Sequence, residues 1–420
     1  MPTHNSTLKT LKSTSENFIN CLIHLAMDSF NFSSLRQYIP QNLPTMPSLP
    51  SWPTDHSSMN PEDKDDLEVS NSTAPRSEKQ SDTMFTVEDP TPISSGPKSY
   101  IDLINECDNF PYYQTNPKLF FAHIHIYYGL YIVDFPETEL GYILPSVAEV
   151  FRGLPDWKID DKNRSLTLVT GNTQEERSRT VGLTWKALRA TNHFKVLKGW
   201  RDELYPVYGP NRELLFSIER AASALFGIVT YGCHMTAYSR TKRLDQDDGA
   251  EQETELKIWV PRRAATKQTY AGMLDNTVAG GIATGESILD SMVRECAEEA
   301  SLAEDLVRSR AKAVGAVTYF HIRDERAGGE TRLLQPECEY VFDLELPEDV
   351  VPKPSDDEVE GFELMGVHEV KERLRQGEFK PNCALVLIDF FVRHGIIASE
   401  EPWYVEIVAR LHRRLEFPTL

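Results

Sequence analysis

Residues 280–302 read GGIATGESILDSMVRECAEEASL, and this stretch decides how the rest of the chain is interpreted. We expect a helix over residues 286–300, in which Glu295, Glu298 and Glu299 stand at positions i, i+3 and i+4 and face the same way. Three neighbouring carboxylates repel one another unless a cation neutralises them. Oxygen ligands of this kind suit Mg²⁺ or Mn²⁺, which proteins hold with a few carboxylates and substrate phosphates. The stretch therefore predicts a divalent-cation site.

The same helix has an apolar face that lets it pack on a core. Leu289, Met292, Val293 and Cys296 recur at helical spacing beside the three acids. A helix with this pattern can bury one face and present its carboxylates at the edge of a site.

The composition is that of an ordinary globular protein with an acidic balance. The 420 residues leave room for two or three domains, and they are 40% hydrophobic and 26% charged. The formal net charge is -20, whereas nucleic-acid binders gather Lys and Arg against the phosphate backbone. We therefore expect no nucleic-acid partner, and an anionic substrate would need cations placed locally.

Cysteine spacing and hydropathy bear on the compartment. The six cysteines are scattered without a CxxC pair, which indicates a reducing compartment and neither a disulfide framework nor a zinc site. No apolar run approaches the roughly 20 residues that cross a bilayer, so no membrane partner is expected. The first residues contain Lys9 and Lys12, no Arg and two acids, which is weak support for a mitochondrial presequence. We expect a cytoplasmic protein, with the mitochondrion as the alternative.

Three regions follow one another along the chain. Residues 1–98 are rich in Ser, Thr, Pro and Asn and are expected to be a disordered tail. Residues 99–220 begin with a helix capped by Ser99 and continue with two strand-like runs at 119–133 and 165–171, which indicates a mixed α/β domain. Residues 221–420 hold further strands and the acidic helix, and we expect them to form the catalytic domain.

Two stretches outside the helix are candidates for substrate binding. Arg262, Arg263 and Lys267 precede the acidic helix, and we expect at least one of them to reach the phosphates of a substrate. The stretch GWRDELYPVYG, residues 199–209, is dense in aromatic and charged residues. It is either a turn that packs its rings into a domain interface or a stacking wall for a flat heteroaromatic ligand.

The spacing of the acidic helix and its leading glycine resembles the Nudix box, G-x5-E-x7-R-E-U-x-E-E-x-G-U, where U is a bulky apolar residue. Ser301 stands where the pattern has Gly. The resemblance implies an α/β/α sandwich, here with an additional mixed α/β N-terminal domain and a disordered tail, and hydrolysis of a diphosphate linked to another moiety. The matching residues are Gly280, Glu286, Arg294, Glu295, Cys296, Glu298, Glu299 and Leu302.

Roles for individual residues follow from this resemblance. Glu295, Glu298 and Glu299 would hold Mg²⁺ or Mn²⁺, and Glu295 would also orient or deprotonate the attacking water. Arg294 and Glu286 would brace the loop and the helix.

Further residues complete the expected site. A main-chain carbonyl of Ala279 or Gly280 would join the metal shell. For substrate binding we assign six residues: Arg262, Arg263, Lys267, Asn276, Gly280 and Gly281. Nudix sites often recruit another acid from outside the box; the candidates are Glu337, Glu339, Glu358 and Glu360, of which we favour Glu339 or Glu360.

A narrower resemblance extends over more of the chain. The segments ERAASALFG, TYAGMLDNTVAGG and GEFKPNCALVLIDFFVRHG are similar to fungal and plant Nudix proteins with an extra N-terminal domain, related to the Nudix part of thiamine pyrophosphokinase fusions. This similarity implies hydrolysis of thiamine diphosphate, or of its oxidised oxo and oxy forms, to the monophosphate and phosphate. Ala271 departs from the pattern, where Pro is expected.

Other functions remain as alternatives. One is a Nudix diphosphatase acting on a nucleotide derivative such as ADP-ribose or coenzyme A. Another is a non-catalytic module that binds thiamine or a nucleotide. The related isomerase chemistry on isopentenyl diphosphate needs a cysteine just after an Asn-Thr pair, whereas Val278 and Ala279 follow Asn276 and Thr277 here.

Overall fold

The computed structural model describes residues 96–242, 254–355 and 357–420, which belong to one compact unit. The expected disordered tail, residues 1–98, lies outside the described residues except for its last three. A mixed α/β fold was expected for the remainder and is confirmed.

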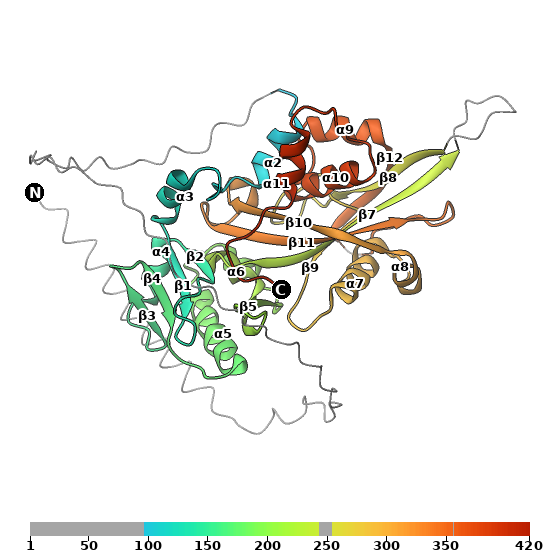
Figure 1. The fold of residues 1–420 in the computed structure, drawn as a ribbon. Helices are drawn as coiled ribbons and strands as arrows, with labels where there is room; N and C mark the ends of the chain where they lie inside the picture. The colour runs from blue at the N-terminus through green and yellow to red at the C-terminus, as the bar shows by residue number, and fades with distance from the viewer. Residues whose placement is uncertain (1–95, 243–253, 356) are drawn as a thin grey trace, which may run out of the picture. The chain divides into compact units, whose positions relative to one another are not determined.

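A six-stranded sheet forms the centre of the described chain (Figure 1). Its strands run in the order β10-β11-β7-β8-β12. The sixth strand, β9, pairs with the first half of β7, whereas β8 pairs with the second half. Strands β7 and β11 are parallel, whereas the other pairs are antiparallel. The strands are β7 (Thr230–Lys242), β8 (Thr254–Arg263), β9 (Val278–Gly281), β10 (Lys312–Ile322), β11 (Leu334–Glu345) and β12 (Val359–Gly366).

Helices cover both faces of this sheet. On one face lie α7 (Ile288–Ala300) and α8 (Glu304–Arg310); on the other lie α2 (Tyr100–Cys107), α9 (Val367–Arg375), α10 (Pro381–Arg393) and α11 (Tyr404–Leu411). Each face has its own hydrophobic cluster, because successive side chains of a strand point to opposite faces. In β11, for example, Phe342 and Leu344 pack with α7 and α8, whereas Val341 packs with α10 and α11. The expected α/β/α sandwich is therefore present.

The acidic helix is close to its predicted bounds. Ser287 caps its first turn by accepting a hydrogen bond from the Asp290 main-chain N–H at 3.1 Å. Ser301 ends it in the left-handed region, with φ of 54° and ψ of 30°. This is the position where the Nudix pattern has Gly, and any residue with a Cβ is strained there by about 1 kcal/mol.

The additional N-terminal elements form a smaller α/β assembly. A four-stranded sheet in the order β2-β1-β4-β3 is followed by a long helix, a hairpin and a short helix. The elements are α3 (Pro117–Ile124), β1 (Tyr128–Ile132), β2 (Gly141–Ile143), α4 (Pro145–Ala148), η1 (Glu149–Phe151), β3 (Trp157–Asp160), β4 (Ser165–Leu168), α5 (Gln174–Ala190), η2 (Val196–Gly199), β5 (Leu204–Tyr208), β6 (Leu214–Glu219) and α6 (Arg220–Phe226). The remaining short helix, η3 (Glu325–Ala327), lies between β10 and β11.

The aromatic core of this assembly explains why it holds together. Trp185 of α5 packs on Phe151 and Phe226 with ring centroids 5.5 and 4.8 Å apart. All three rings are fully buried. Offset and edge-on ring contacts of this kind add about 1 kcal/mol each beyond the area they bury.

The structure differs from two expectations about this region. The run at 119–133 was predicted as a strand, but its first half is helix α3, because Asn116 caps the helix and Pro117 occupies its first turn. Helix α2, which we placed in the N-terminal domain, packs against α10 and α11 of the sandwich. The division of the chain at residue 220 stays a prediction.

A buried ion pair fastens the C-terminal segment to the end of α2. Arg413 and Asp108 are both fully buried, with Nη1 and Oδ1 3.0 Å apart. Arg413 also donates to the carbonyls of Phe110 and Pro111 at 2.6 and 2.9 Å, and it lies over the Tyr112 ring. The pair closes the sandwich on the face covered by α2 and α11.

Replacing Arg413 should destabilise the protein strongly. Arg413→Met leaves the Asp108 carboxylate buried without this partner, and we expect the free energy of unfolding to fall by about 3 kcal/mol. The lower end of the usual range applies because Arg410 lies 3.4 Å from the same carboxylate. Urea denaturation measures the change. Arg308→Met, which removes two exposed ion pairs, is the control, and a loss no larger than the control's contradicts the assignment.

Candidate active site

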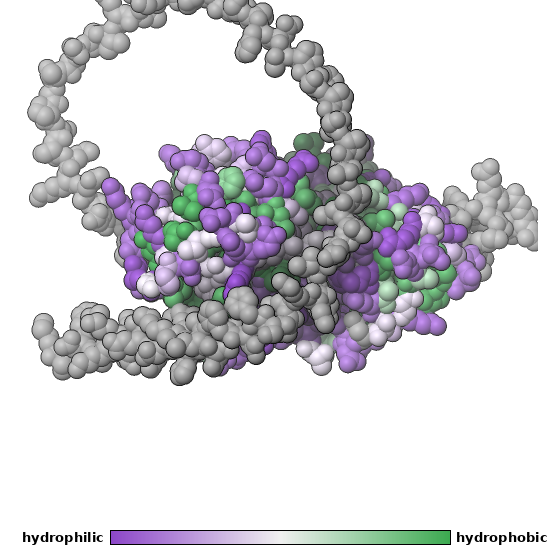
Figure 2. Space-filling view, turned by 90° about the horizontal axis from the view of Figure 1, so that it is seen from below, coloured by the Kyte–Doolittle hydropathy of each residue, from purple (hydrophilic) through white to green (hydrophobic). Residues whose placement is uncertain are grey.

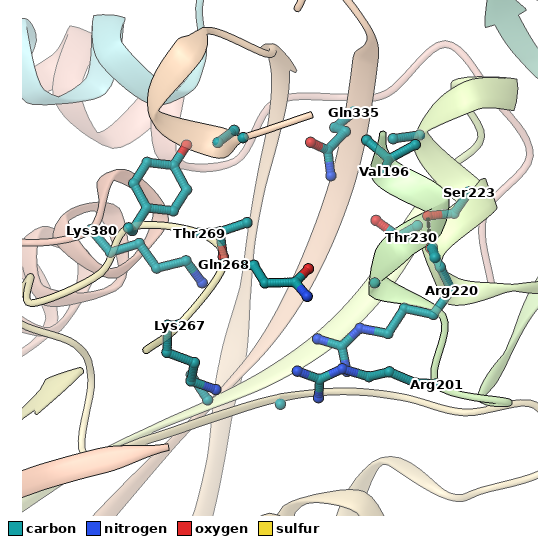
Figure 3. Close-up of a pocket in the computed structure, with 18 of the residues that line it drawn as sticks. Val196, Arg201, Arg220, Ser223, Thr230, Lys267, Gln268, Thr269, Gln335 and Lys380 are labelled. Atoms are coloured by element: carbon teal, nitrogen blue, oxygen red, sulfur yellow. Dashed lines mark hydrogen bonds between the residues drawn. The ribbon is translucent and has the colours of Figure 1, made fainter. Parts of the chain in front are cut away.

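A cavity of about 790 Å³ opens where the acidic helix, the sheet and the N-terminal assembly meet. Its walls come from α7, the loop at residues 266–270, strands β10 and β11, and the N-terminal segments at 195–205 and 220–224. Figure 3 shows Arg201 and Arg220 entering from one side and Lys267 and Lys380 from the other. Cationic and polar side chains from distant parts of the sequence thus converge on one space.

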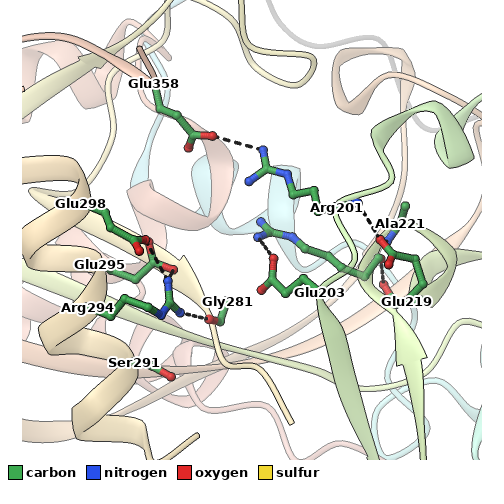
Figure 4. A network of polar contacts seen from close by, with 12 residues as sticks. Arg201, Glu203, Glu219, Ala221, Gly281, Ser291, Arg294, Glu295, Glu298 and Glu358 are labelled. Carbon is green, nitrogen blue, oxygen red and sulfur yellow. Dashed lines mark hydrogen bonds and ion pairs between the residues drawn. The ribbon is translucent and has the colours of Figure 1, made fainter. Parts of the chain in front are cut away.

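Arg294 organises the box around this cavity. Its guanidinium donates to Glu286 at 2.9 Å, to Glu295 at 2.9 Å and to Glu298 at 3.0 Å. It also donates to the Gly281 carbonyl at 3.3 Å (Figure 4). One side chain thereby joins the end of β9, the loop before α7 and two of the three acids on the helix.

The three box acids differ in burial. Glu295 is 8% exposed, and burial raises the pKa of its carboxyl group. Glu298 lies at the open edge of the helix, with 54% of its side chain exposed. Glu299 accepts a hydrogen bond from the Ala279 N–H at 3.0 Å. Burial, and then the neighbouring Glu295, raise the pKa of Glu299 to about 8.

These acids fit a hard divalent cation. Carboxylates that are costly to ionise alone are suited to a site in which a cation balances their charge. Glu295, Glu298 and Glu299 all line the cavity, as do Ala279 and Gly280, whose carbonyls we expected to contribute. Within the described ranges, no three His, Cys, Asp or Glu side chains are already gathered as metal ligands. The three acids would therefore have to exchange contacts, such as those with Arg294, for a cation.

The two glycines that end β9 allow close approaches from opposite sides. A Cβ on Gly280 would overlap the carboxyl group of Glu295. A Cβ on Gly281 would overlap the hydroxyl end of Tyr205, which belongs to the N-terminal hairpin. Both positions therefore require a residue without a side chain, because the space of a Cβ is already occupied.

Of the three basic residues that precede the acidic helix, two reach the cavity and one does not. Arg263 and Lys267 line the cavity, where Lys267 pairs with Glu358 and Arg263 pairs with Asp275 at 2.6 Å. Arg263 also donates to the Tyr270 and Thr269 carbonyls, so it shapes the loop at 266–270. Arg262 is not part of the cavity wall and donates to the Gly272 carbonyl at 2.8 Å.

Asn276 also stands away from the cavity wall. Its side chain is buried, meets His234 Nδ1 at 2.7 Å and donates to the Cys383 carbonyl at 3.3 Å. These contacts give Asn276 a place in the sandwich core. Gly280 lines the cavity, whereas Gly281 lies beside it and offers its carbonyl to Arg294.

The candidates for an additional acid are also separated by the structure. Glu337 and Glu358 line the cavity. Glu339, one of the two that we favoured, is 5% exposed behind the wall and lies 3.5 Å from His234. Glu360, the other, is exposed on β12 and is not part of the wall. The geometry thus favours Glu337 or Glu358 over both residues that we had preferred.

Sequence reasoning missed several cavity residues. Lys380 lines the cavity, and its ammonium group has no hydrogen bond or ion pair in the described part of the chain. Burial opposes its charge, but Cys383 and Asp275 outweigh this and keep the Lys380 pKa raised. His321 is buried, and burial lowers its pKa to about 4, so that its imidazole is neutral at pH 7.

The aromatic stretch at 199–209 lies partly in an interface and partly in the cavity wall, and its role in stacking a ligand stays a prediction. Tyr205 is buried against Gly281, as expected for a domain interface. Trp200, Arg201 and Glu203 line the cavity. Arg189 lies over the Trp200 ring, 4.9 Å from its centroid, and holds the ring in place.

Comparison with known proteins agrees with this geometry. The NUDIX domain family matches residues 248–383, and a domain of unknown function, DUF4743, matches residues 130–230. An uncharacterized protein of Saccharomyces cerevisiae is 34% identical over 335 residues, which cover 77% of this chain and 93% of the yeast protein. Nudix hydrolase 20, chloroplastic, of Arabidopsis thaliana is 39% identical over 66% of this chain and 71% of its own length. Nudix hydrolase 24, chloroplastic, of the same plant is 38% identical over 66% and 70%.

The chain therefore belongs to the Nudix hydrolase family, and the predicted enzyme class is confirmed. Enzymes of this family act on small molecules and generally use divalent ions such as Mg²⁺ or Mn²⁺. None of the helices in the described residues has the length and apolar character to cross a membrane. Figure 2 shows hydrophilic residues over much of one face, with hydrophobic residues scattered among them.

Gly280→Ala should impair catalysis while sparing the fold. The added Cβ displaces the Glu295 carboxyl group, which is the end of a flexible side chain, so the strand itself need not move. We expect kcat/KM to fall about 100-fold, as for other displacements of about 1 Å at a reacting centre. The thermal midpoint should stay within about 2 °C of wild type.

Gly361→Ala is the matched control, because no atom lies within 4 Å of the added Cβ. Diphosphate hydrolysis in Mg²⁺ and thermal unfolding are measured on both variants. Equal activity of the two variants would show that the Glu295 position does not matter.

Proposed function

We propose that this protein hydrolyses the diphosphate of a small molecule whose other end is a flat heteroaromatic group. The best candidates are thiamine diphosphate and its oxidised oxo and oxy forms, which would yield the monophosphate and phosphate. The observation that carries this proposal is the single cavity in which box acids, unpaired or exposed cations and aromatic rings meet.

The size and shape of the cavity support such a substrate. A volume of about 790 Å³ is within the usual range for sites that bury a drug-sized ligand. Trp200, Tyr205, Tyr270 and Tyr319 contribute aromatic surface to its wall. Rings of a heteroaromatic ligand bind offset-stacked or edge-on to such faces.

Charge supports a diphosphate as the other part of the substrate. The wall carries nine Lys and Arg and seven Asp and Glu, although the chain as a whole has a net charge of -20. The local cations are what an acidic protein needs to admit an anion. They are Lys195, Lys198, Arg201, Arg220, Arg263, Lys267, Arg294, Arg323 and Lys380.

The polar end of the cavity offers hydrogen bonds to a ring. His321 Nδ1 contacts the Cys107 carbonyl at 3.1 Å, whereas Nε2 has no partner in the described residues. Gln335 donates to Glu337 at 3.2 Å, and both side chains line the wall. A heteroaromatic ring with a donor or acceptor on its edge would give His321 Nε2 a partner, whereas a plain hydrocarbon ring would leave it unpaired.

The chemistry is attack of water on one phosphorus of the diphosphate. A bond forms between the water oxygen and phosphorus, the bond to the bridging oxygen breaks, and that oxygen leaves with the other phosphate. A divalent ion held by Glu295, Glu298 and Glu299 would neutralise the diphosphate and acidify a water. Glu295 would orient that water or accept its proton. Arg294 and Glu286 would hold the helix and the loop before it in their relative positions.

Basic side chains outside the box would bind the negative charge of the diphosphate that the metal ion does not neutralise. Lys380 is placed for this role because its ammonium group faces the cavity without an ion pair in the described chain (Figure 3). Arg263 and Lys267 are tied to Asp275 and Glu358, so we assign them mainly to shaping the loop at 266–270. Arg262 and Asn276 stay outside this proposed contact set.

We place this activity in the cytosol, with the mitochondrion as the alternative. Five cysteines in the described residues are free and buried, which suits a reducing compartment. The two plant relatives carry the word chloroplastic in their names, which leaves the mitochondrion and other locations open for this chain.

A substrate panel tests the proposal. Purified protein with Mg²⁺ is assayed for phosphate release or product formation from thiamine diphosphate, oxothiamine diphosphate, ADP-ribose and coenzyme A. We expect the highest kcat/KM for a thiamine-type diphosphate, because pocket contacts appear as differences in transition-state binding. Glu298→Gln should lower this rate about 100-fold or more.

Glu304→Gln is the matched control, since Glu304 is an exposed acid on α8 outside the cavity. A preference for ADP-ribose or coenzyme A would replace the thiamine assignment with a nucleotide one. Phosphate release that is the same in wild type and Glu298→Gln would rule out hydrolysis at the box.

A further inference from the structure

The N-terminal assembly is fixed against the box by direct contacts. The Thr284 N–H, in the loop between β9 and α7, donates to the Leu204 carbonyl of β5 at 2.7 Å. The hydroxyl of Thr284 lies 3.0 Å from that of Ser217 on β6. Tyr205 occupies the space that the absent Cβ of Gly281 leaves open. The hairpin therefore has a set position relative to the catalytic loop.

Two arginines from this assembly reach the cavity side by side. Arg201 precedes β5, and Arg220 is the first residue of α6 (Figure 3). Figure 4 shows Arg201 and its neighbours facing Glu295 and Glu298 across the space, with Glu358 above them in the view and joined to Arg201 by a dashed line. The box acids thus occupy one wall and the arginines another.

One buried carboxylate positions both arginine-bearing segments. Glu219 is 2% exposed and accepts hydrogen bonds from the N–H groups of Arg201 at 3.0 Å and Ala221 at 3.4 Å. The Arg220 N–H donates to the Glu203 carbonyl at 2.8 Å, which continues the β5–β6 pairing. The register of the hairpin therefore sets the spacing of the two guanidinium groups.

Each guanidinium group retains donors for a ligand. Arg201 donates through Nη2 to Glu358 at 3.2 Å, and Arg220 donates through Nη1 to Glu203 at 2.9 Å. A guanidinium has five N–H donors, so these bonds use a minority of them. The exposed fractions of the two side chains are 47% and 35%, and both line the cavity. Arg220 also lies over the Tyr205 ring, which limits its rotation.

The partners of the arginines argue for a site that is preorganised and still accessible. Glu203 and Glu358, which line the cavity themselves, hold the two guanidinium groups in place through one hydrogen bond each. Paired guanidinium groups match the oxygens of a phosphate in a fork geometry that Lys cannot reproduce. A cation at the box can neutralise one phosphate of a diphosphate, and the other phosphate needs counter-charges of its own.

We propose that the N-terminal domain forms the second half of the active site, in which Arg201 and Arg220 bind the phosphate group that lies away from the box acids. The domain of unknown function is then a substrate-binding domain, and Glu219 is its positioning residue. This inference rests on the proposed function, since it assumes a diphosphate in the cavity.

Calorimetric binding of methylenediphosphonate, a diphosphate that cannot be hydrolysed, tests the inference. The full chain is titrated in the presence of Mg²⁺, as wild type and as Arg201→Gln, Arg220→Gln and the double variant. We expect each single variant to weaken binding about tenfold or more, in line with the loss of charge-assisted hydrogen bonds. Arg201→Lys should restore only part of the loss, because the charge returns without the fork.

The matched control is Arg179→Gln, because Arg179 is exposed on α5 and does not line the cavity. Thermal unfolding confirms that each variant folds, and Arg201, with about half its side chain exposed, is the safer substitution. Binding by the double variant that equals the Arg179→Gln control overturns the inference, as does a lack of binding by wild type.

An assay of diphosphate hydrolysis distinguishes a failure of this inference from a failure of the proposed function. If wild type binds methylenediphosphonate through the arginines but releases no product from any diphosphate in the panel, the hydrolytic proposal fails and the binding role stands. If hydrolysis proceeds with unchanged KM in the double variant, the hydrolytic proposal stands and the role of the N-terminal domain is overturned.

Discussion

The end of strand β9 is the constraint on which the site depends. Gly280 and Gly281 lie side by side, and the missing Cβ atoms admit Glu295 of the box at one and Tyr205 of the N-terminal hairpin at the other. Arg294 binds the Gly281 carbonyl and three box carboxylates from the same place. A side chain at Gly280 would displace the Glu295 carboxyl group, and one at Gly281 would displace the Tyr205 ring. The doublet thus joins the two halves of the cavity.

The charge of the cavity wall differs from that of the chain as a whole. The chain is acidic overall, yet the cavity wall holds nine basic side chains against seven acidic ones. Most of these cations are already held by carboxylates, which fixes their positions without removing their remaining donors. Four of the nine, Lys195, Lys198, Arg323 and Lys380, form no ion pair with a carboxylate in the described residues. Such a wall can exchange internal ion pairs for contacts with a diphosphate and its metal ion.

The sequence predicted those features that local spacing controls. The acidic helix and its end at Ser301 follow from the order of residues between 280 and 302. Of the predicted apolar face, Met292, Val293 and Cys296 are buried, whereas Leu289 is exposed. The α/β/α sandwich followed from resemblance and is present in the structure. The strand predicted at 119–133 was wrong in its first half, because the Asn116–Pro117 helix start was overlooked in a run of apolar residues.

Features that depend on tertiary contacts could not be predicted in this way. Arg262 and Arg263 are adjacent in sequence, but the alternation of β8 sends only Arg263 to the cavity. Glu337 and Glu339 share a strand face, and only the first reaches the wall. The cavity position of Lys380 depends on where α10 packs, and that of Arg220 on the hairpin register. None of these leaves a periodic signal in the sequence.

The central claim is that box acids and the N-terminal arginines serve one diphosphate site. A crystal structure with Mn²⁺ and methylenediphosphonate tests it most directly, because the anomalous signal of Mn²⁺ locates the ion independently. The account predicts the ion at Glu295, Glu298 and Glu299, with one phosphonate beside it and the other in contact with Arg201 and Arg220. Manganese away from the three glutamates, or a diphosphonate that does not reach the arginines, would contradict it.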